Sequence, residues 1–69
     1  MNRMLELVIL QEEVQAELRL KEIEYGKAKD FNVKFELINR ITELSNLSTK
    51  LATEIFKESH SSLKELMNA

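Results

Sequence analysis

Hydrophobic residues recur with a helical period through the second half of the chain. Three leucines stand seven residues apart, with one isoleucine between the first two and another four residues after the third. These seam residues are Leu37, Ile41, Leu44, Leu51 and Ile55. Polar residues occupy the opposite side, which is typical of an amphipathic helix that packs its apolar side against another helix. The pattern predicts a helix over about residues 31–58, with a seam that requires a helical neighbour.

The first helix, predicted over about residues 2–25, has two apolar stripes. Winding this segment at about 100° per residue gathers one stripe that we assign to the hairpin core. It consists of Leu7, Leu10, Val14 and Leu18. A second stripe, called the outer stripe below, consists of Leu5, Ile9, Ala16, Leu20 and Ile23. A helix with two apolar faces has more than one neighbour, so the outer stripe is the predicted interface for a partner. The alternative is that the C-terminal segment folds back and covers it.

Residues 26–30 form the predicted connection between the helices. Gly26 readily adopts the left-handed conformation in which helices often end, and Asp30 or Asn32 can accept hydrogen bonds from the free amides of the next helix. So short a connection forces the two helices to run antiparallel. An apolar cluster follows it and is expected to cap the hydrophobic end of the hairpin. This cluster consists of Phe31, Val33 and Phe35.

Residues 59–69 form a C-terminal extension with two interpretations. Ser62 followed by Glu65 has the spacing of a capping box, which would begin a short third helix. The apolar period also continues through Phe56 and Leu63 without a break. Because the segment has neither glycine nor proline, we favour a continuous second helix with a frayed end.

Two polar features also bear on the hairpin. Ser48 stands in the seam where another isoleucine would fit, and one polar seam position can fix register or oligomeric state at some cost in stability. Pairs of an acid followed four residues later by a base support helix formation in both segments. These pairs are Glu17 with Lys21 and Glu36 with Arg40.

The composition agrees with an all-α fold and limits how far the chain can stabilise itself. Its 69 residues include no proline, no cysteine and one glycine, with 43% hydrophobic and 32% charged residues. A chain this short buries a smaller fraction of its surface than a domain of ordinary size, and no disulfide or thiolate metal site can staple it. We therefore predict one all-α domain over residues 1–69, an antiparallel two-helix hairpin that completes a helical bundle by self-association or by binding another protein.

The charge distribution disfavours nucleic acid and membranes as partners. Ten basic and 12 acidic residues are mixed along the chain and give a net charge of −2, so no basic face for phosphate stands out. The longest strictly apolar run, residues 7–10, is far shorter than the roughly 20 residues that a bilayer requires. Acidic residues flank this run and no small-residue cleavage site follows, unlike a signal peptide. We expect a cytoplasmic protein without membrane insertion.

No residue pattern predicts catalysis, a cofactor or a metal site. His60 is the only histidine, and its position among serines at the edge of the apolar stripe is typical of a solvated surface histidine. Metal sites in helical bundles use Glu-x-x-His pairs, but Lys57 stands three residues before His60. A single glycine cannot form a phosphate-binding loop. We therefore predict a chain that is not an enzyme.

Taken together, these features favour a non-enzymatic protein–protein interaction module. We expect a small helical adaptor or chaperone-like assembly factor that buries an apolar helix face against itself or against a helical partner. The alternative is a dimeric helical-hairpin regulator that binds RNA or a component of transcription. The salt dependence of binding distinguishes the two hypotheses, because binding to nucleic acid weakens steeply as the salt concentration rises.

Overall fold

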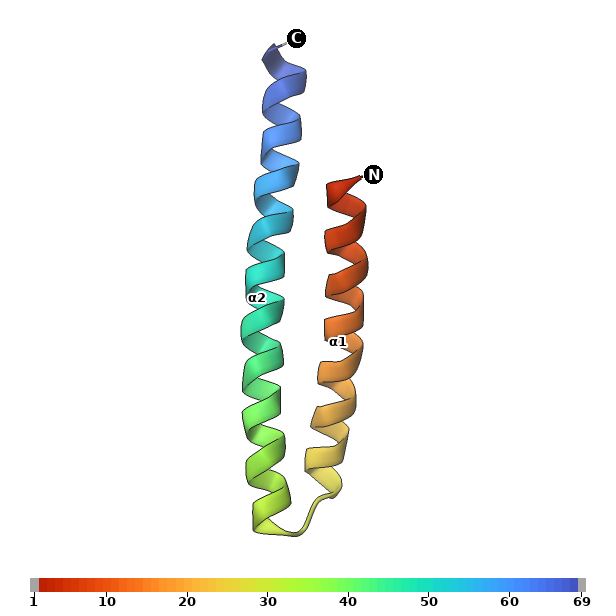
Figure 1. Cartoon of the computed structure of the whole chain (residues 1–69), viewed down its shortest axis with the longest axis vertical. Helices are drawn as coiled ribbons and strands as arrows, with labels where there is room; N and C mark the ends of the chain where they lie inside the picture. The colour runs from red at the N-terminus through yellow and green to blue at the C-terminus, as the bar shows by residue number, and fades with distance from the viewer. Residues whose placement is uncertain (1, 69) are drawn as a thin grey trace.

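The computed structural model describes residues 2–68, which form two antiparallel α-helices joined by a short loop (Figure 1). The helices are α1, Arg3–Lys27, and α2, Phe31–Asn68. No strand occurs within residues 2–68, so the prediction of an all-α antiparallel hairpin is confirmed. Residues 1 and 69, which the predicted domain also includes, lie outside the described range.

Helix α1 begins at a side-chain cap and ends two residues later than predicted. The Oδ1 atom of Asn2 accepts hydrogen bonds from the amides of Met4 at 2.9 Å and Leu5 at 3.4 Å, which satisfies two of the free amides at the helix start. The prediction that Gly26 ends the helix is wrong. Gly26 is helical with negative φ, and the chain leaves the helix at Ala28 in an extended conformation.

Asp30 is the N-cap of α2 and is one of the two residues, Asp30 and Asn32, that the sequence offered for this role. Its Oδ1 atom accepts a hydrogen bond from the amide of Asn32 at 2.8 Å. Its carbonyl oxygen accepts another from the amide of Lys34 at 3.0 Å. The carboxylate also lies at the positive end of the helix dipole, which favours a negative charge there. The loop that remains between the helices is residues 28–30.

Helix α2 continues without a break through the predicted extension, so the favoured interpretation of one continuous helix is correct and no third helix forms before residue 68. With 38 residues against the 25 of α1, it extends about 20 Å further at about 1.5 Å per residue. Figure 1 shows its C-terminal turns running past the start of α1. The molecule is therefore a rod with extents of 58 × 16 × 15 Å.

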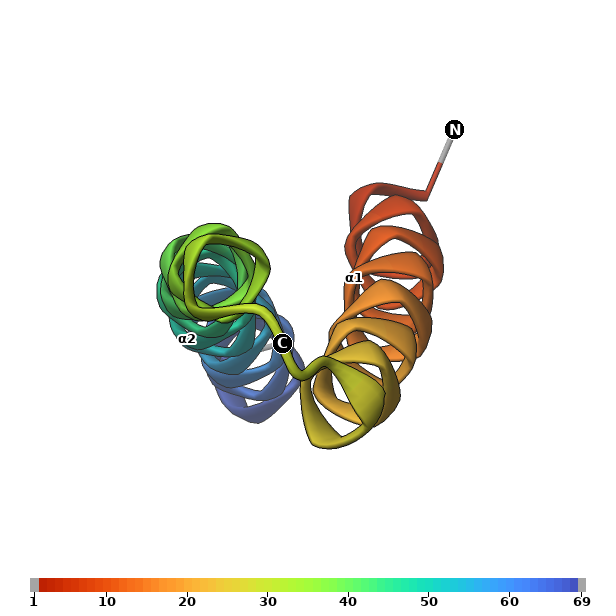
Figure 2. The same cartoon turned by 90° about the horizontal axis from the view of Figure 1, so that it is seen from below.

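The core is a single row of side chains between the helices. Leu7 and Val14 of α1 are buried against Leu44 and Leu51 of α2. The flanks of this row are less enclosed and are formed by partly buried residues, namely Leu18, Leu37, Ile41 and Ile55. Viewed along the rod (Figure 2), the helices lie side by side as one pair. Each helix therefore turns most of its circumference away from the other.

Two sequence predictions about the core are corrected. Leu10 was assigned to the core but is 43% exposed, because it lies about 60° around α1 from Leu7, outside the contact with α2. The cluster Phe31, Val33 and Phe35 was expected to cap the hairpin, but all three side chains are exposed. Phe31 and Phe35 stack on each other with centroids 6.3 Å apart. Phe31 and Phe35 lie about 140° and 180° around α2 from the core residue Leu44, so both side chains point away from α1.

Candidate interaction surface

The outer stripe of α1 is exposed along its whole length. Ala16 follows Leu7 by nine residues, which at about 100° per residue is half a turn around the helix. The stripe therefore faces directly away from the core residues Leu7 and Val14. Its large side chains are 48–60% exposed, and these are Leu5, Ile9, Leu20 and Ile23. Helix α1 is thus apolar on two opposite sides, and α2 covers only one of them.

Acidic residues border the outer stripe. At about 100° per residue, Glu6, Glu13 and Glu24 line one edge, within about 80° of the stripe centre. Glu12 and Arg19 line the other edge, and all five residues are exposed. Among residues 2–68, the only one of these in an ion pair is Glu24, whose Oε2 lies 3.4 Å from the Nζ of Lys21. The stripe is therefore an apolar strip within a mostly negative frame.

A polar cluster occupies the middle of the contact between the helices. Ser48 is 8% exposed, and its hydroxyl accepts a hydrogen bond from the Nε2 of Gln15 at 2.5 Å. Its carbonyl oxygen accepts another from the Nε2 of Gln11 at 3.1 Å. The Oε1 of Gln11 is buried and has no partner among the described residues. These bonds favour one register of α1 along α2, because sliding either helix along its axis would leave buried polar groups unpaired.

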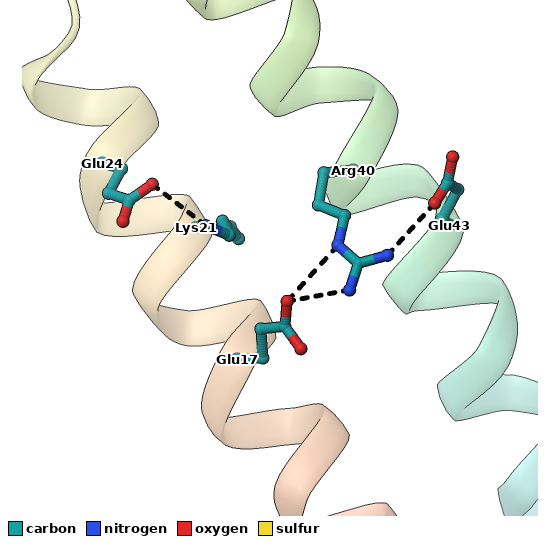
Figure 3. A network of polar contacts seen from close by, with 5 residues as sticks. All are labelled: Glu17, Lys21, Glu24, Arg40 and Glu43. Atoms are coloured by element: carbon teal, nitrogen blue, oxygen red, sulfur yellow. Dashed lines mark hydrogen bonds and ion pairs between the residues drawn. The ribbon is translucent and has the colours of Figure 1, made fainter.

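Charged residues join the helices between the polar cluster and the loop (Figure 3). The Arg40 guanidinium contacts the Oε1 of Glu17 across the helix pair at 2.9 Å and the Oε2 of Glu43 on its own helix at 3.2 Å. Hydrogen bonding to Glu17, followed by that to Glu43, raises the pKa of Arg40 above its ordinary value. Neither pair expected from the sequence, Glu17 with Lys21 or Glu36 with Arg40, is present among the described residues.

These polar contacts between the helices were not predicted from the sequence. Gln11 and Gln15 flank the core stripe of α1, and Ser48 was noted in the seam. Glutamine beside a core stripe together with serine inside the facing seam is the signal by which the cluster could have been found. No comparable pattern in the sequence indicates that Arg40 contacts Glu17, because this contact depends on the register of the two helices.

Helix α2 also exposes apolar residues, and two of them are separated by small residues. Ile38 and Phe56 lie on one side of α2, and exposed Ser45 and Ala52 lie between them on that side. Three threonine hydroxyls on α2 donate to carbonyl oxygens four residues earlier in the same helix, which meets their hydrogen-bonding needs locally. These residues are Thr42, Thr49 and Thr53. Helix α2 also exposes Leu63, Leu66 and Met67 in its last turns, so its exposed apolar residues cover a longer stretch than the outer stripe of α1. The outer stripe is the surface that lies directly opposite the core of the hairpin.

His60 is exposed and stacks on Phe56, with ring centroids 6.0 Å apart and planes at 8°. No pocket opens beside it or elsewhere on the described chain. Within residues 2–68, no group of three or more His, Cys, Asp or Glu residues is arranged to hold a metal ion. The surroundings of His60 thus offer neither an enclosed substrate site nor a set of ligands.

Neither of the two described helices has an apolar stretch of the length needed to cross a bilayer. Comparison with protein-family models, with curated proteins and with solved structures found no match to this chain.

Proposed function

We propose that this chain is a non-enzymatic protein–protein interaction module, a small helical adaptor or chaperone-like assembly factor. It acts by burying the outer stripe of α1 against a further helix, so that the hairpin becomes part of a larger helical bundle. The observation that carries the proposal is the exposure of Leu5, Ile9, Leu20 and Ile23 on the side of α1 opposite the core. Contiguous exposed apolar surface of this kind marks interaction sites in soluble proteins.

The large accessible surface area of the hairpin supports the proposal that it packs against a further helix. The accessible surface is 5658 Å², against roughly 4,500 Å² for a compact monomer of 8.1 kDa. The excess of roughly 1,200 Å² is of the same order as the ~800 Å² that each partner buries in a standard protein interface. At ~25 cal/mol per Å² of apolar area, burial of four large stripe residues is a substantial driving force for association.

Replacing Ile9 and Ile23 together by aspartate tests the proposal. The matched control is Asn39→Asp with Asn46→Asp, which adds the same two negative charges at exposed positions of α2. Each tagged chain is used as bait in an extract of its source cells, and captured proteins are identified by mass spectrometry. Circular dichroism of the purified chains verifies that all remain helical.

We expect the unaltered chain and the control to retain the same protein, either a helical partner or an untagged copy of the chain. The Ile9→Asp, Ile23→Asp variant should lose it, because two carboxylates in an apolar contact cannot be desolvated without a large cost. Equal retention by both variants, with helicity intact, would show that the outer stripe is not the binding surface.

A further inference from the structure

The charged residues on the two edges of the outer stripe determine which kind of helix can pack on it. A helix that packs on the stripe places its own flanking side chains beside the two edges of α1. One edge carries Glu6, Glu13 and Glu24 without any basic residue, and the other carries Glu12 and Arg19. Four acidic residues against one basic residue therefore face the flanks of whatever binds.

The outer stripe of a second copy of this chain is a poor occupant. In an antiparallel, two-fold symmetric pairing, each edge of one α1 faces the same edge of the other. The stripe pairs with itself when Leu5 opposes Ile23 of the second copy. That register places Glu6 beside Glu24 of the second copy, and the two copies of Glu13 beside each other. Like charges at an interface disfavour the pairing.

The other edge compensates in part, because Arg19 lies near Glu12 of the second copy in the same register. A parallel pairing has its own conflict. There the acidic edge faces the opposite edge at equal height, so Glu13 lies beside Glu12 of the second copy. In both pairings of α1 with α1, glutamates oppose glutamates, either at the middle of the interface or along a whole edge.

From this charge pattern, and resting on the proposed function, we infer that the outer stripe binds an amphipathic helix of another protein whose apolar stripe is flanked by lysine or arginine. The stripe from Leu5 to Ile23 spans about 27 Å at about 1.5 Å per residue, so the partner helix needs about five turns to cover it. Basic flanks would pair with Glu6, Glu13 and Glu24, three exposed carboxylates spread along one edge. The same flanks would disfavour binding of a second copy of this chain.

Two synthetic helical peptides of about 20 residues provide the probe. Both have the same leucine and isoleucine stripe, and they differ only in having lysine or glutamate at the flanking positions. Binding of the labelled peptides to the full chain is measured by fluorescence anisotropy at low salt and at 0.5 M NaCl. Light scattering of the chain alone, over a dilution series, reports its own association.

We expect the lysine peptide to bind roughly tenfold more tightly than the glutamate peptide at low salt, which is the combined effect of three exposed ion pairs. The difference should shrink at 0.5 M NaCl because salt screens exposed charges. Replacing Glu6, Glu13 and Glu24 together by lysine should reverse the preference. The matched control is Glu36→Lys, Glu58→Lys and Glu65→Lys on α2, which gives the same change in net charge, from −2 to +4. In this control the glutamate peptide should not bind more tightly than the lysine peptide.

Other outcomes overturn the inference and separate it from the proposed function. Equal or tighter binding of the glutamate peptide, or reversal in the α2 control as well, would show that the border does not select the partner. A stable dimer of the chain that dissociates on Ile9→Asp with Ile23→Asp would show that a second copy covers the stripe, which leaves the interaction function standing. The chain could also be a monomer that binds neither peptide, with capture of its source-cell partner unaffected by Ile9→Asp and Ile23→Asp. That result would contradict both this inference and the proposed function.

Discussion

Leu44 is the most buried residue of the hairpin, and its truncation to alanine is the sharpest test of how the two helices pack. It is 2% exposed and lies among Leu7, Val14 and Leu51. Removing three buried heavy atoms from such a site costs about 2–5 kcal/mol, because the transfer free energy is lost and a cavity remains. A chain of this length has a free energy of unfolding of about 3–10 kcal/mol, so the loss is a large share of it.

Leu47 provides the matched control, since it has the same side chain three residues later on the same helix. It is 42% exposed and lies about 60° around α2 from Leu44. Its truncation to alanine leaves no enclosed cavity and removes only part of the ~1.5–3 kcal/mol that a fully buried leucine contributes. We expect a destabilisation of about 1 kcal/mol or less, offset slightly by the higher helix propensity of alanine.

Urea unfolding followed by circular dichroism measures both variants against the unaltered chain. Each is measured at several protein concentrations, so that any association is held constant in the comparison. The expected result is a much lower midpoint for Leu44→Ala and a nearly unchanged one for Leu47→Ala. If Leu47→Ala destabilises as much as Leu44→Ala at every concentration, the helices pack through a different face and the core described above is wrong.

Substitutions at three further positions have defined outcomes. Gly26→Ala should raise the free energy of unfolding by about 0.5–1 kcal/mol, because Gly26 is helical and an added Cβ meets nothing within 4 Å; thermal unfolding checks this. Ser48→Ala should be nearly neutral in urea unfolding, since the half-buried Gln15 can turn to water, whereas Ser48→Asp buries a charge and should lower the midpoint strongly. Arg40→Gln should destabilise slightly at low salt and not at 1 M NaCl, since its contacts with Glu17 are exposed. The raised pKa of Arg40 means that its stabilising charge is present throughout the neutral range and is lost only in strong alkali, so the Arg40→Gln effect should not vary between pH 6 and pH 9.

The helices and the outer stripe were predictable from the sequence because they depend on short-range periodicity. The seven-residue spacing of Leu37, Leu44 and Leu51 specifies a helix wherever it is placed. Asp30 caps α2 through an amide two residues away, so its role is local too. The same reasoning placed Ile9 and Ile23 on a stripe separate from the core, and the structure leaves both exposed.

Only the tertiary structure decided which residues beside each stripe meet the other helix. A helical period gives the angle of a residue around its own axis, but the rotation and height of the neighbouring helix are not contained in it. Leu10 was therefore assigned to the core, although the contact extends toward Gln11 and Ser48 instead. For the same reason Arg40 was paired within its own helix, whereas the register of the hairpin brings it to Glu17. Local periodicity determined the elements and their faces, and the packing of two long helices determined every contact between them.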